Sequence, residues 1–149
     1  MNGEVLKIDE VHKRLQDGTA VYVDVRSTGE FQGGHAAGAY HVPLIEMGPA
    51  GREVNERFVA AVRALRDSLG GDGAPELIVA CQAGGRSKQA CQLLVAEGIT
   101  KVSDFSGGWG GRPNPFGGVG LQGWGTSGNP TSTTTEDGRD WPSIRALMK

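Results

Sequence analysis

A short apolar run that ends at a cysteine constrains the fold of this chain more than any other feature. Leu77-Ile78-Val79-Ala80 leads directly into the loop Cys81-Gln82-Ala83-Gly84-Gly85-Arg86. A run that is apolar at every position is typical of a parallel strand buried on both faces. The residues from Ser87 to Glu97 then predict a helix, which Gly98 ends. We expect its inward side chains to be Ala90, Leu93 and Leu94.

The same patterns predict further elements on both sides of this loop. The expected helices run from an Asp9 cap to Gly18, as one turn over Ser27–Phe31, over Asn55–Leu69, and from an Asp140 cap to Leu147. The other expected strands are Val21–Val25 and Lys101–Phe105, with a loop over 33–40. Alternating strands and helices predict an α/β fold with a central, mostly parallel sheet and helices on both faces. Ligands of such sheets bind beyond the carboxyl ends of the strands, where Cys81 is expected.

Net charge, hydropathy and cysteine content limit the kinds of partner, cofactor and cellular location that are expected. The net charge of -2 gives no reason to expect a nucleic acid or a membrane surface as partner. No apolar stretch approaches membrane-spanning length, and Met1–Asp9 lacks the layout of a signal peptide. Two cysteines are too few for a disulfide scaffold, and no metal-ligand spacing is present. The expected location is the reducing cytoplasm, which suits a free thiol.

The loop after the apolar strand has the composition of an anion cradle. The reactive form of cysteine is the thiolate, and a free thiol titrates at about 8.5. Backbone N–H groups of a turn and the start of a helix both favour an anion. We therefore expect Cys81 to be the reactive residue and the rest of the loop to bind substrate: Gln82, Ala83, Gly84, Gly85, Arg86 and Ser87. The same cradle could hold a phosphate, and a lone cysteine at a strand end is otherwise a small buried apolar residue.

Other polar residues are expected to be structural. Cys91 lies inside the helix, where a buried, inert thiol is expected, and Lys88 is expected to be solvated. The four-residue spacing of Arg26 and Glu30 predicts an ion pair. The histidines lack any metal-ligand pattern: His35 and His41 are expected to make structural hydrogen bonds, and His12 to face solvent.

Taken in order, several segments resemble the rhodanese family. The resemblance covers about residues 5–108 and rests on Asp24-Val25-Arg26, Glu30-Phe31, Gly34-His35, Gly38-Ala39, Val42-Pro43, the loop from Cys81 to Ser87, and Val102–Gly108. It implies a rhodanese-like three-layer fold and a single-domain thiosulfate sulfurtransferase that carries sulfur as a persulfide on Cys81. It also implies a small anionic sulfur donor, a thiol or cyanide acceptor, a protein acceptor as a further possibility, and no metal or organic cofactor.

Loop length bears on the alternatives within this superfamily. The loop has six residues from Cys81 to Arg86, as in rhodaneses, whereas the related phosphatases use a longer loop that accommodates phosphate. The resemblance therefore implies sulfur transfer, with a Cys-dependent phosphatase or arsenate reductase of the same fold as a weaker alternative. A second alternative is a non-enzymatic sulfur-relay or partner-binding module, motivated by the glycine-rich end of the chain.

The end of the chain departs from the family pattern. The chain has 25 glycines, against about ten expected from average usage, and much of the excess follows residue 106. Trp124 to Pro130 resembles the closing motif of the family but arrives late, which indicates an insertion at about 109–123. We expect a rhodanese domain over 1–130 and a C-terminal extension over 131–149, with Thr131–Thr135 exposed. The insertion and the extension are expected to wrap the domain or cover the mouth of the site, with an oligomer contact as the alternative. Three aromatic side chains in this part of the chain are expected to be buried: Trp109, Phe116 and Trp124.

Overall fold

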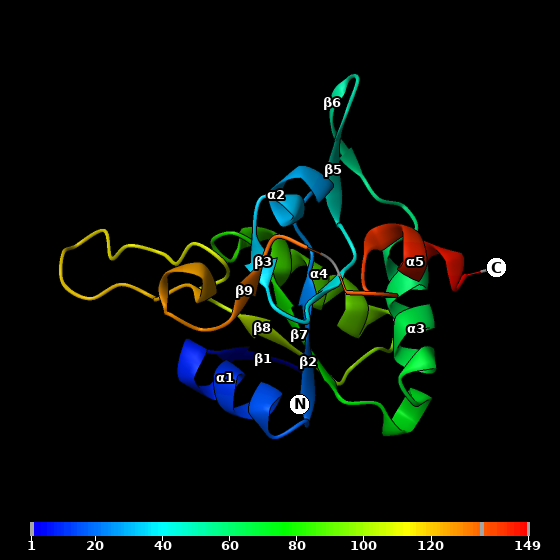
Figure 1. Ribbon diagram of the computed structural model, residues 1–149, viewed down its shortest axis with the longest axis horizontal. Coiled ribbons are helices and arrows are strands. Elements are labelled where there is room, and N and C mark those ends of the chain that lie inside the picture. Colours follow the sequence, from blue (N-terminus) through cyan, green and yellow to red (C-terminus); the bar gives the residue numbers. More distant parts are fainter. Residues whose placement is uncertain (1, 135, 149) are drawn as a thin grey trace.

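The computed structural model describes residues 2–134 and 136–148, so expectations that fall on Met1, Thr135 and Lys149 lie outside the described residues. A five-stranded parallel sheet forms the centre of the molecule (Figure 1). Its strands, in the order β1-β8-β7-β2-β4, are β1 (Asn2–Leu6), β8 (Val102–Phe105), β7 (Glu76–Ala80), β2 (Ala20–Asp24) and β4 (Tyr40–His41). All four neighbouring pairs are parallel. The predicted α/β class is confirmed.

The central strand β7 is buried on both faces because helices cover both sides of the sheet. Leu77 and Val79 pack into one apolar cluster with α3 (Phe58–Ser68), α4 (Gly85–Ala96) and α5 (Trp141–Ala146). Ile78 and Ala80 pack into the other with α1 (Ile8–Gln16) and α2 (Thr28–Gln32). Complete burial of each large apolar side chain contributes about 1.5–3 kcal/mol. This alternation explains why the sequence is apolar at every position of the strand.

Several elements were not predicted from the sequence. The strand β1 lies at the edge of the sheet and pairs with β8. Its Val5 side chain is 63% exposed. Because an edge strand is not buried on both faces, its sequence lacks the continuous apolar run of a central strand. The short strand β4 begins at Tyr40, the last residue of the expected loop over 33–40. The hairpin of β5 (Ile45–Gly48) and β6 (Gly51–Val54) projects from the domain (Figure 1). Its apolar side chains Met47 and Val54 are exposed.

Three helix starts and one helix face differ from expectation, among them the start of α4, which begins at Gly85 rather than Ser87. The helix α1 begins after Lys7 rather than at Asp9, although Gly18 follows its end with φ +74° as expected. The helix α3 begins at Phe58 because the Asn55 side chain binds the Pro43 carbonyl and holds a turn before the helix. On α4, Leu93 is 40% exposed, so its predicted inward position is wrong.

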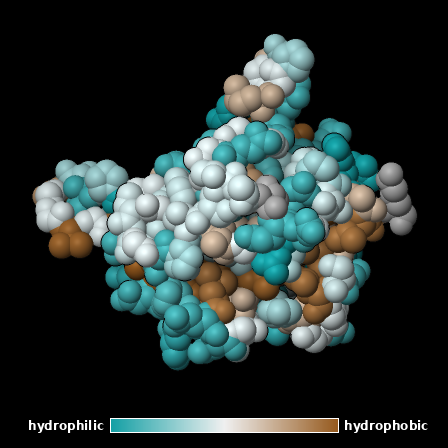
Figure 2. Space-filling view, viewed as in Figure 1, coloured by the Kyte–Doolittle hydropathy of each residue, from teal (hydrophilic) through white to brown (hydrophobic). Residues whose placement is uncertain are grey.

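The predicted insertion forms an arm that projects from the domain. Two backbone hydrogen bonds between Arg112 and Leu121 close its base, at 2.8 and 2.7 Å. Figure 2 shows the arm on the left with an apolar tip, and Phe116 and Val119 are 95% and 94% exposed. The expected burial of Phe116 is therefore wrong, because the arm contacts the domain only at its base. Trp124, by contrast, is 4% exposed.

The chain after the arm packs back onto the domain. A 3-10 turn η2 (Trp124–Thr126) leads to β9 (Thr131–Ser132), which pairs with β3 (His35–Ala36). The last helix, α5, begins after Asp140, whose side chain accepts a hydrogen bond from Ser143 N at 3.0 Å, as predicted. It packs against α3 and buries Ile144 completely. Among residues 2–134 and 136–148, no helix is long and apolar enough to cross a membrane.

Candidate functional site

The sulfur of Cys81 lies in a closed setting immediately beyond the carboxyl end of β7. The residue is 2% exposed. Gly84 N donates a hydrogen bond to Sγ at 3.1 Å, and Ser87 Oγ lies 3.5 Å from Sγ. Gly84 adopts φ +104° at the N-cap of α4, a conformation that favours glycine. The start of α4 is therefore directed at the sulfur, and its positive end favours an anion there.

Hydrogen bonds from the base of the arm hold the outer side of the loop. The carbonyls of residues 81–83 each accept one or more of them. Trp109 N donates to the first carbonyl at 2.8 Å, and Gly110 N donates to the second at 2.9 Å. Arg112 donates to the third through Nε at 2.9 Å and Nη2 at 2.6 Å. Three successive carbonyls of the loop are therefore satisfied by residues from a distant part of the sequence.

The predicted substrate-binding residues do not all lie at the sulfur. Cys81, Gly84 and Ser87 are brought together at the sulfur, whereas Gln82, Ala83 and Gly85 are exposed. Sequence reasoning did not identify Arg112. The available signal was a single basic residue closely following the paired glycines 107 and 108.

Arg86 is paired with a carboxylate. Its Nη1 and Nη2 donate to the two carboxylate oxygens of Glu30 at 2.6 and 2.9 Å. The predicted ion pair between Arg26 and Glu30 is therefore wrong. Arg26 lies on the chain leaving β2 and turns back to Asp24, while Glu30 closes a capping box with Ser27 and faces Arg86. Hydrogen bonding to Arg86 is the main cause that lowers the pKa of Glu30 to about 2.

This shift predicts an acid-dependent loss of stability. The Glu30 pKa is depressed from 4.5 to about 2, so its contribution is complete above pH 4.5 and falls as the pH drops toward 2. Because the side chain is 35% exposed, solvent screening reduces the effect to about 1 kcal/mol. Between pH 7 and pH 3, the wild type should lose about that much more unfolding free energy than Glu30→Gln, measured by urea denaturation. Glu56→Gln, at an exposed site, should behave as the wild type; equal losses in Glu30→Gln and the wild type would refute the assignment.

Beneath the loop, Arg26 and Asp24 form a buried ion pair. The Arg26 and Asp24 side chains are 2% and 1% exposed, and Nη2 lies 2.8 Å from Oδ2. Arg26 also donates to the Gly34 carbonyl at 2.7 Å, and its guanidinium lies 5.1 Å from the centre of the Trp109 ring. These contacts tie β2 to the base of the arm. The pair contacts the loop through Arg26 Nη1, which donates to the Gln82 side chain at 3.5 Å.

The two buried histidines are structural, as expected. His35 Nδ1 and Nε2 bind the carbonyls of Phe31 and Thr134, at 2.8 and 3.1 Å. His41 Nε2 binds the Arg26 carbonyl at 2.8 Å, and burial lowers the His41 pKa. Their ring nitrogens are therefore used in holding backbone segments together. His12, expected in solvent, is half-buried beside Trp124.

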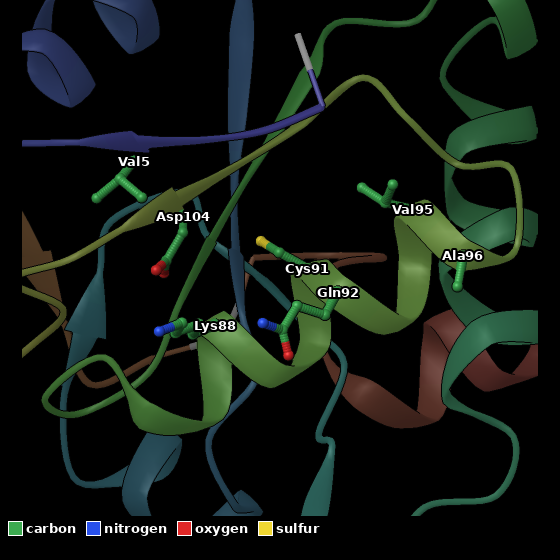
Figure 3. Close-up of a pocket in the computed structure, with 7 residues that line it drawn as sticks. All are labelled: Val5, Lys88, Cys91, Gln92, Val95, Ala96 and Asp104. Carbon is green, nitrogen blue, oxygen red and sulfur yellow. The ribbon is translucent and has the colours of Figure 1, made fainter.

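Behind the loop, a buried carboxylate adjoins Ser87. Ser87 Oγ donates to Asp104 Oδ1 at 2.6 Å, and burial raises the pKa of Asp104. Asp104 and Cys91 line a cavity of about 380 Å³ between α4 and the edge of the sheet, with Lys88 at its side (Figure 3). Cys91 is buried, as expected, and burial raises its pKa to about 12. A thiol with that pKa is almost fully protonated at neutral pH, which agrees with the unreactive role expected for Cys91.

Comparison with known proteins agrees with this geometry. Residues 7–111 match the family described as Rhodanese-like domain. The chain is 39% identical over 88 residues to "Thiosulfate sulfurtransferase 16, chloroplastic" of Arabidopsis thaliana, covering 59% of this chain and 69% of that protein. It is 36% identical over 110 residues to "Thiosulfate sulfurtransferase 18" of the same plant, covering 71% and 76%. The crystal structure of Rv0390 from M. tuberculosis superposes with a TM-score of 0.68 at 24% identity, covering 90% of this chain and all of that one.

Proposed function

This chain belongs to the rhodanese-like domain family, and from that premise we propose that it is a sulfurtransferase whose sulfur carrier is Cys81. The observation that carries the proposal is the surroundings of Sγ. A thiol that is 2% exposed accepts a hydrogen bond from Gly84 N and faces the start of α4. Such a setting favours a thiolate or a persulfide anion over a neutral apolar group. The names of the two plant relatives support thiosulfate as the donor.

The proposed reaction is two successive displacements at sulfur. The Cys81 thiolate attacks the outer sulfur of thiosulfate, the new S–S bond forms, and sulfite leaves with the electron pair of the old S–S bond. A thiolate or cyanide then attacks the outer sulfur of the persulfide, and the Cys81 thiolate leaves. Both steps balance without an added oxidant or reductant, and each depends on the thiolate fraction and the leaving group.

The loop is proposed to bind the anionic groups of both steps. Gly84 N already reaches Sγ, and it would stay close to the inner sulfur of a persulfide. Residues 82, 83 and 85 are exposed, so they would be accessible to a donor that approaches the loop. The predicted role of Arg86 in orienting the donor stays a prediction, and its charge is shared with Glu30.

Intact-mass measurement tests this proposal. After incubation with thiosulfate, the protein should gain the mass of one sulfur atom, and cyanide should remove it. Cys81→Ser should gain nothing, because the gain requires a thiolate at this position. Mercaptopyruvate in a parallel sample would show whether that donor is also used. An unchanged mass in the wild type, or an equal gain in Cys81→Ser, would overturn the proposal.

The exposed tip of the arm favours a protein as an alternative sulfur acceptor. Phe116 and Val119 are almost fully exposed on a segment whose base contacts the loop, and exposed apolar side chains are common at contacts between proteins. In this second candidate function, the chain relays sulfur between proteins. Near-zero turnover with thiosulfate and cyanide, together with persulfide formation from a protein donor, would favour the relay.

A further inference from the structure

The cationic side chains around the loop differ in whether their charge is already neutralised. Arg26 is paired with Asp24, and Arg86 with Glu30. Lys88 forms no salt bridge with a described residue, but it lies at the cavity behind the loop, beside Asp104, and not at the outer side of the loop (Figure 3). Three arginines lie near the loop: Arg26, Arg86 and Arg112. The first two therefore have a carboxylate partner that offsets their charge.

Arg112 binds the loop without a carboxylate. Both of its hydrogen bonds go to the uncharged carbonyl of Ala83. Within residues 2–134 and 136–148, no carboxylate lies within salt-bridge distance of its guanidinium, and Nη1 makes no hydrogen bond. The side chain is exposed. Burial raises the pKa of Asp104, and the charge of Arg112 acts on it at longer range to oppose that rise, but no salt bridge among the described residues offsets this charge. It can therefore attract an anion that approaches the loop.

The contact of Arg112 with the Ala83 carbonyl also fixes the N–H group that reaches the sulfur. In a trans peptide, the carbonyl of one residue and the N–H of the next point in opposite directions. Arg112 holds the carbonyl of the 83–84 peptide outward, and Gly84 N, on its other side, donates to Cys81 Sγ. A Cβ built on Gly84 would lie 2.6 Å from Arg112 Nη2, which shows that the guanidinium packs directly against this peptide. The orientation of one peptide thus links Arg112 to the sulfur.

The backbone of the arm places Arg112 at this position. The hydrogen bonds between Arg112 and Leu121 close the arm at the point where the side chain departs. Just before it, Trp109 N and Gly110 N bind the preceding two loop carbonyls. The guanidinium is therefore held by a backbone that is itself fixed to the loop.

We propose that Arg112 is a positioning residue of the sulfur site and supplies the unpaired positive charge that makes the site select an anionic sulfur donor. The inference rests on the proposed function and deepens it. It assigns donor selection to a residue of the arm and gives Arg86 mainly a role in holding α2 against the loop. A donor such as thiosulfate, which carries two negative charges, should depend on Arg112 more than an uncharged dialkyl trisulfide does.

Kinetics with three variants test the role of the charge. Arg112→Gln should raise the KM for thiosulfate by about tenfold or more, since it removes a charge-assisted contact, and should change the KM for an uncharged trisulfide by less than about threefold. Arg112→Lys keeps the charge and should recover most of the lost affinity. The matched control is Arg63→Gln, because Arg63 also binds a backbone carbonyl, that of Glu97, but lies on α3. Arg63→Gln should match the wild type.

Alkylation of Cys81 by iodoacetamide tests the positioning role without any sulfur donor. In Arg112→Gln, the pH of half-maximal alkylation rate should rise by about half a unit or more, because the thiolate loses a nearby positive charge and a fixed N–H donor. Thermal unfolding should change little, since the side chain is exposed and the backbone hydrogen bonds of residues 109, 110 and 112 remain in the variant.

Failure of this inference can be told apart from failure of the proposed function. A wild type that forms the persulfide, together with an Arg112→Gln variant that matches Arg63→Gln in KM and in alkylation, would overturn the inference alone. An Arg112→Lys variant as impaired as Arg112→Gln would overturn the role of the charge. A wild type that forms no persulfide would overturn the proposed function, and the alkylation profile would still decide whether Arg112 positions the loop.

Discussion

Replacing Cys81 with serine is expected to reduce sulfur transfer from thiosulfate to cyanide by at least about a thousandfold in kcat/KM. Serine is close in size to cysteine, so the loop at the end of β7 should still fold. A serine hydroxyl is not ionised at neutral pH and carries no sulfur that can accept a second one. Steady-state formation of thiocyanate measures the loss.

The second cysteine provides the matched control for this experiment. Cys91 is also buried, but it faces the cavity behind the loop, and its pKa of about 12 keeps it protonated. Cys91→Ala should therefore retain kcat/KM within about threefold of the wild type, with a modest loss of stability from the missing sulfur atom. Substantial activity in Cys81→Ser, or a thousandfold loss in Cys91→Ala, would contradict the assignment of Cys81 as the carrier.

Removing Asp24 is expected to have the largest effect on stability. Asp24→Ala should lower the free energy of unfolding by about 3–5 kcal/mol, because it leaves the Arg26 guanidinium buried without a counter-charge. Asp24 also accepts hydrogen bonds from the Arg26 backbone N at 3.0 Å and from Nε at 3.1 Å, so several contacts are lost together. Against a typical total of about 5–15 kcal/mol, this is a large share. Urea denaturation at pH 7 measures it.

A surface pair on α3 gives the comparison. Arg66 and Asp67 lie 3.3 Å apart, and the Asp67 side chain is 60% exposed. Asp67→Ala should therefore cost less than about 1 kcal/mol. Should Asp24→Ala be too unstable to purify, Asp24→Asn offers a milder change that keeps a hydrogen-bond acceptor and should still cost more than Asp67→Ala. Equal costs for Asp24→Asn and Asp67→Ala would refute the role given to the buried pair.

Two kinds of feature could be predicted from the sequence: a strand that is buried at every position, and a helix end that depends on one local residue. The apolar run from Leu77 to Ala80 predicts a central strand, and the structure places both of its faces against packed helices. The end of α1 before Gly18 and the Asp140 cap of α5 were also predicted, because each rests on a local backbone requirement. The strand β1 left no comparable pattern, since one of its side chains, Val5, is exposed at the edge of the sheet.

The site was predictable only as far as its residues are neighbours in sequence. The loop from Cys81 to Arg86 reads as an anion cradle because its glycines and its following helix are contiguous. The partner of Arg86 could not be read in the same way: spacing favoured Arg26 for Glu30, and burial of Arg26 against Asp24 changed the pairing. Arg112 reaches the loop through a fold contact that no local pattern encodes.

The base of the arm has a consequence for the order in which this protein acquires its chemistry during synthesis. The loop carbonyls of residues 81–83 have their hydrogen-bond donors at Trp109, Gly110 and Arg112. A nascent chain that has emerged only as far as the end of β8 carries the cysteine but none of these donors. The thiol is thus translated before the loop around it is fixed, and under the proposed function we expect sulfur transfer only once the glycine-rich region has emerged and folded back.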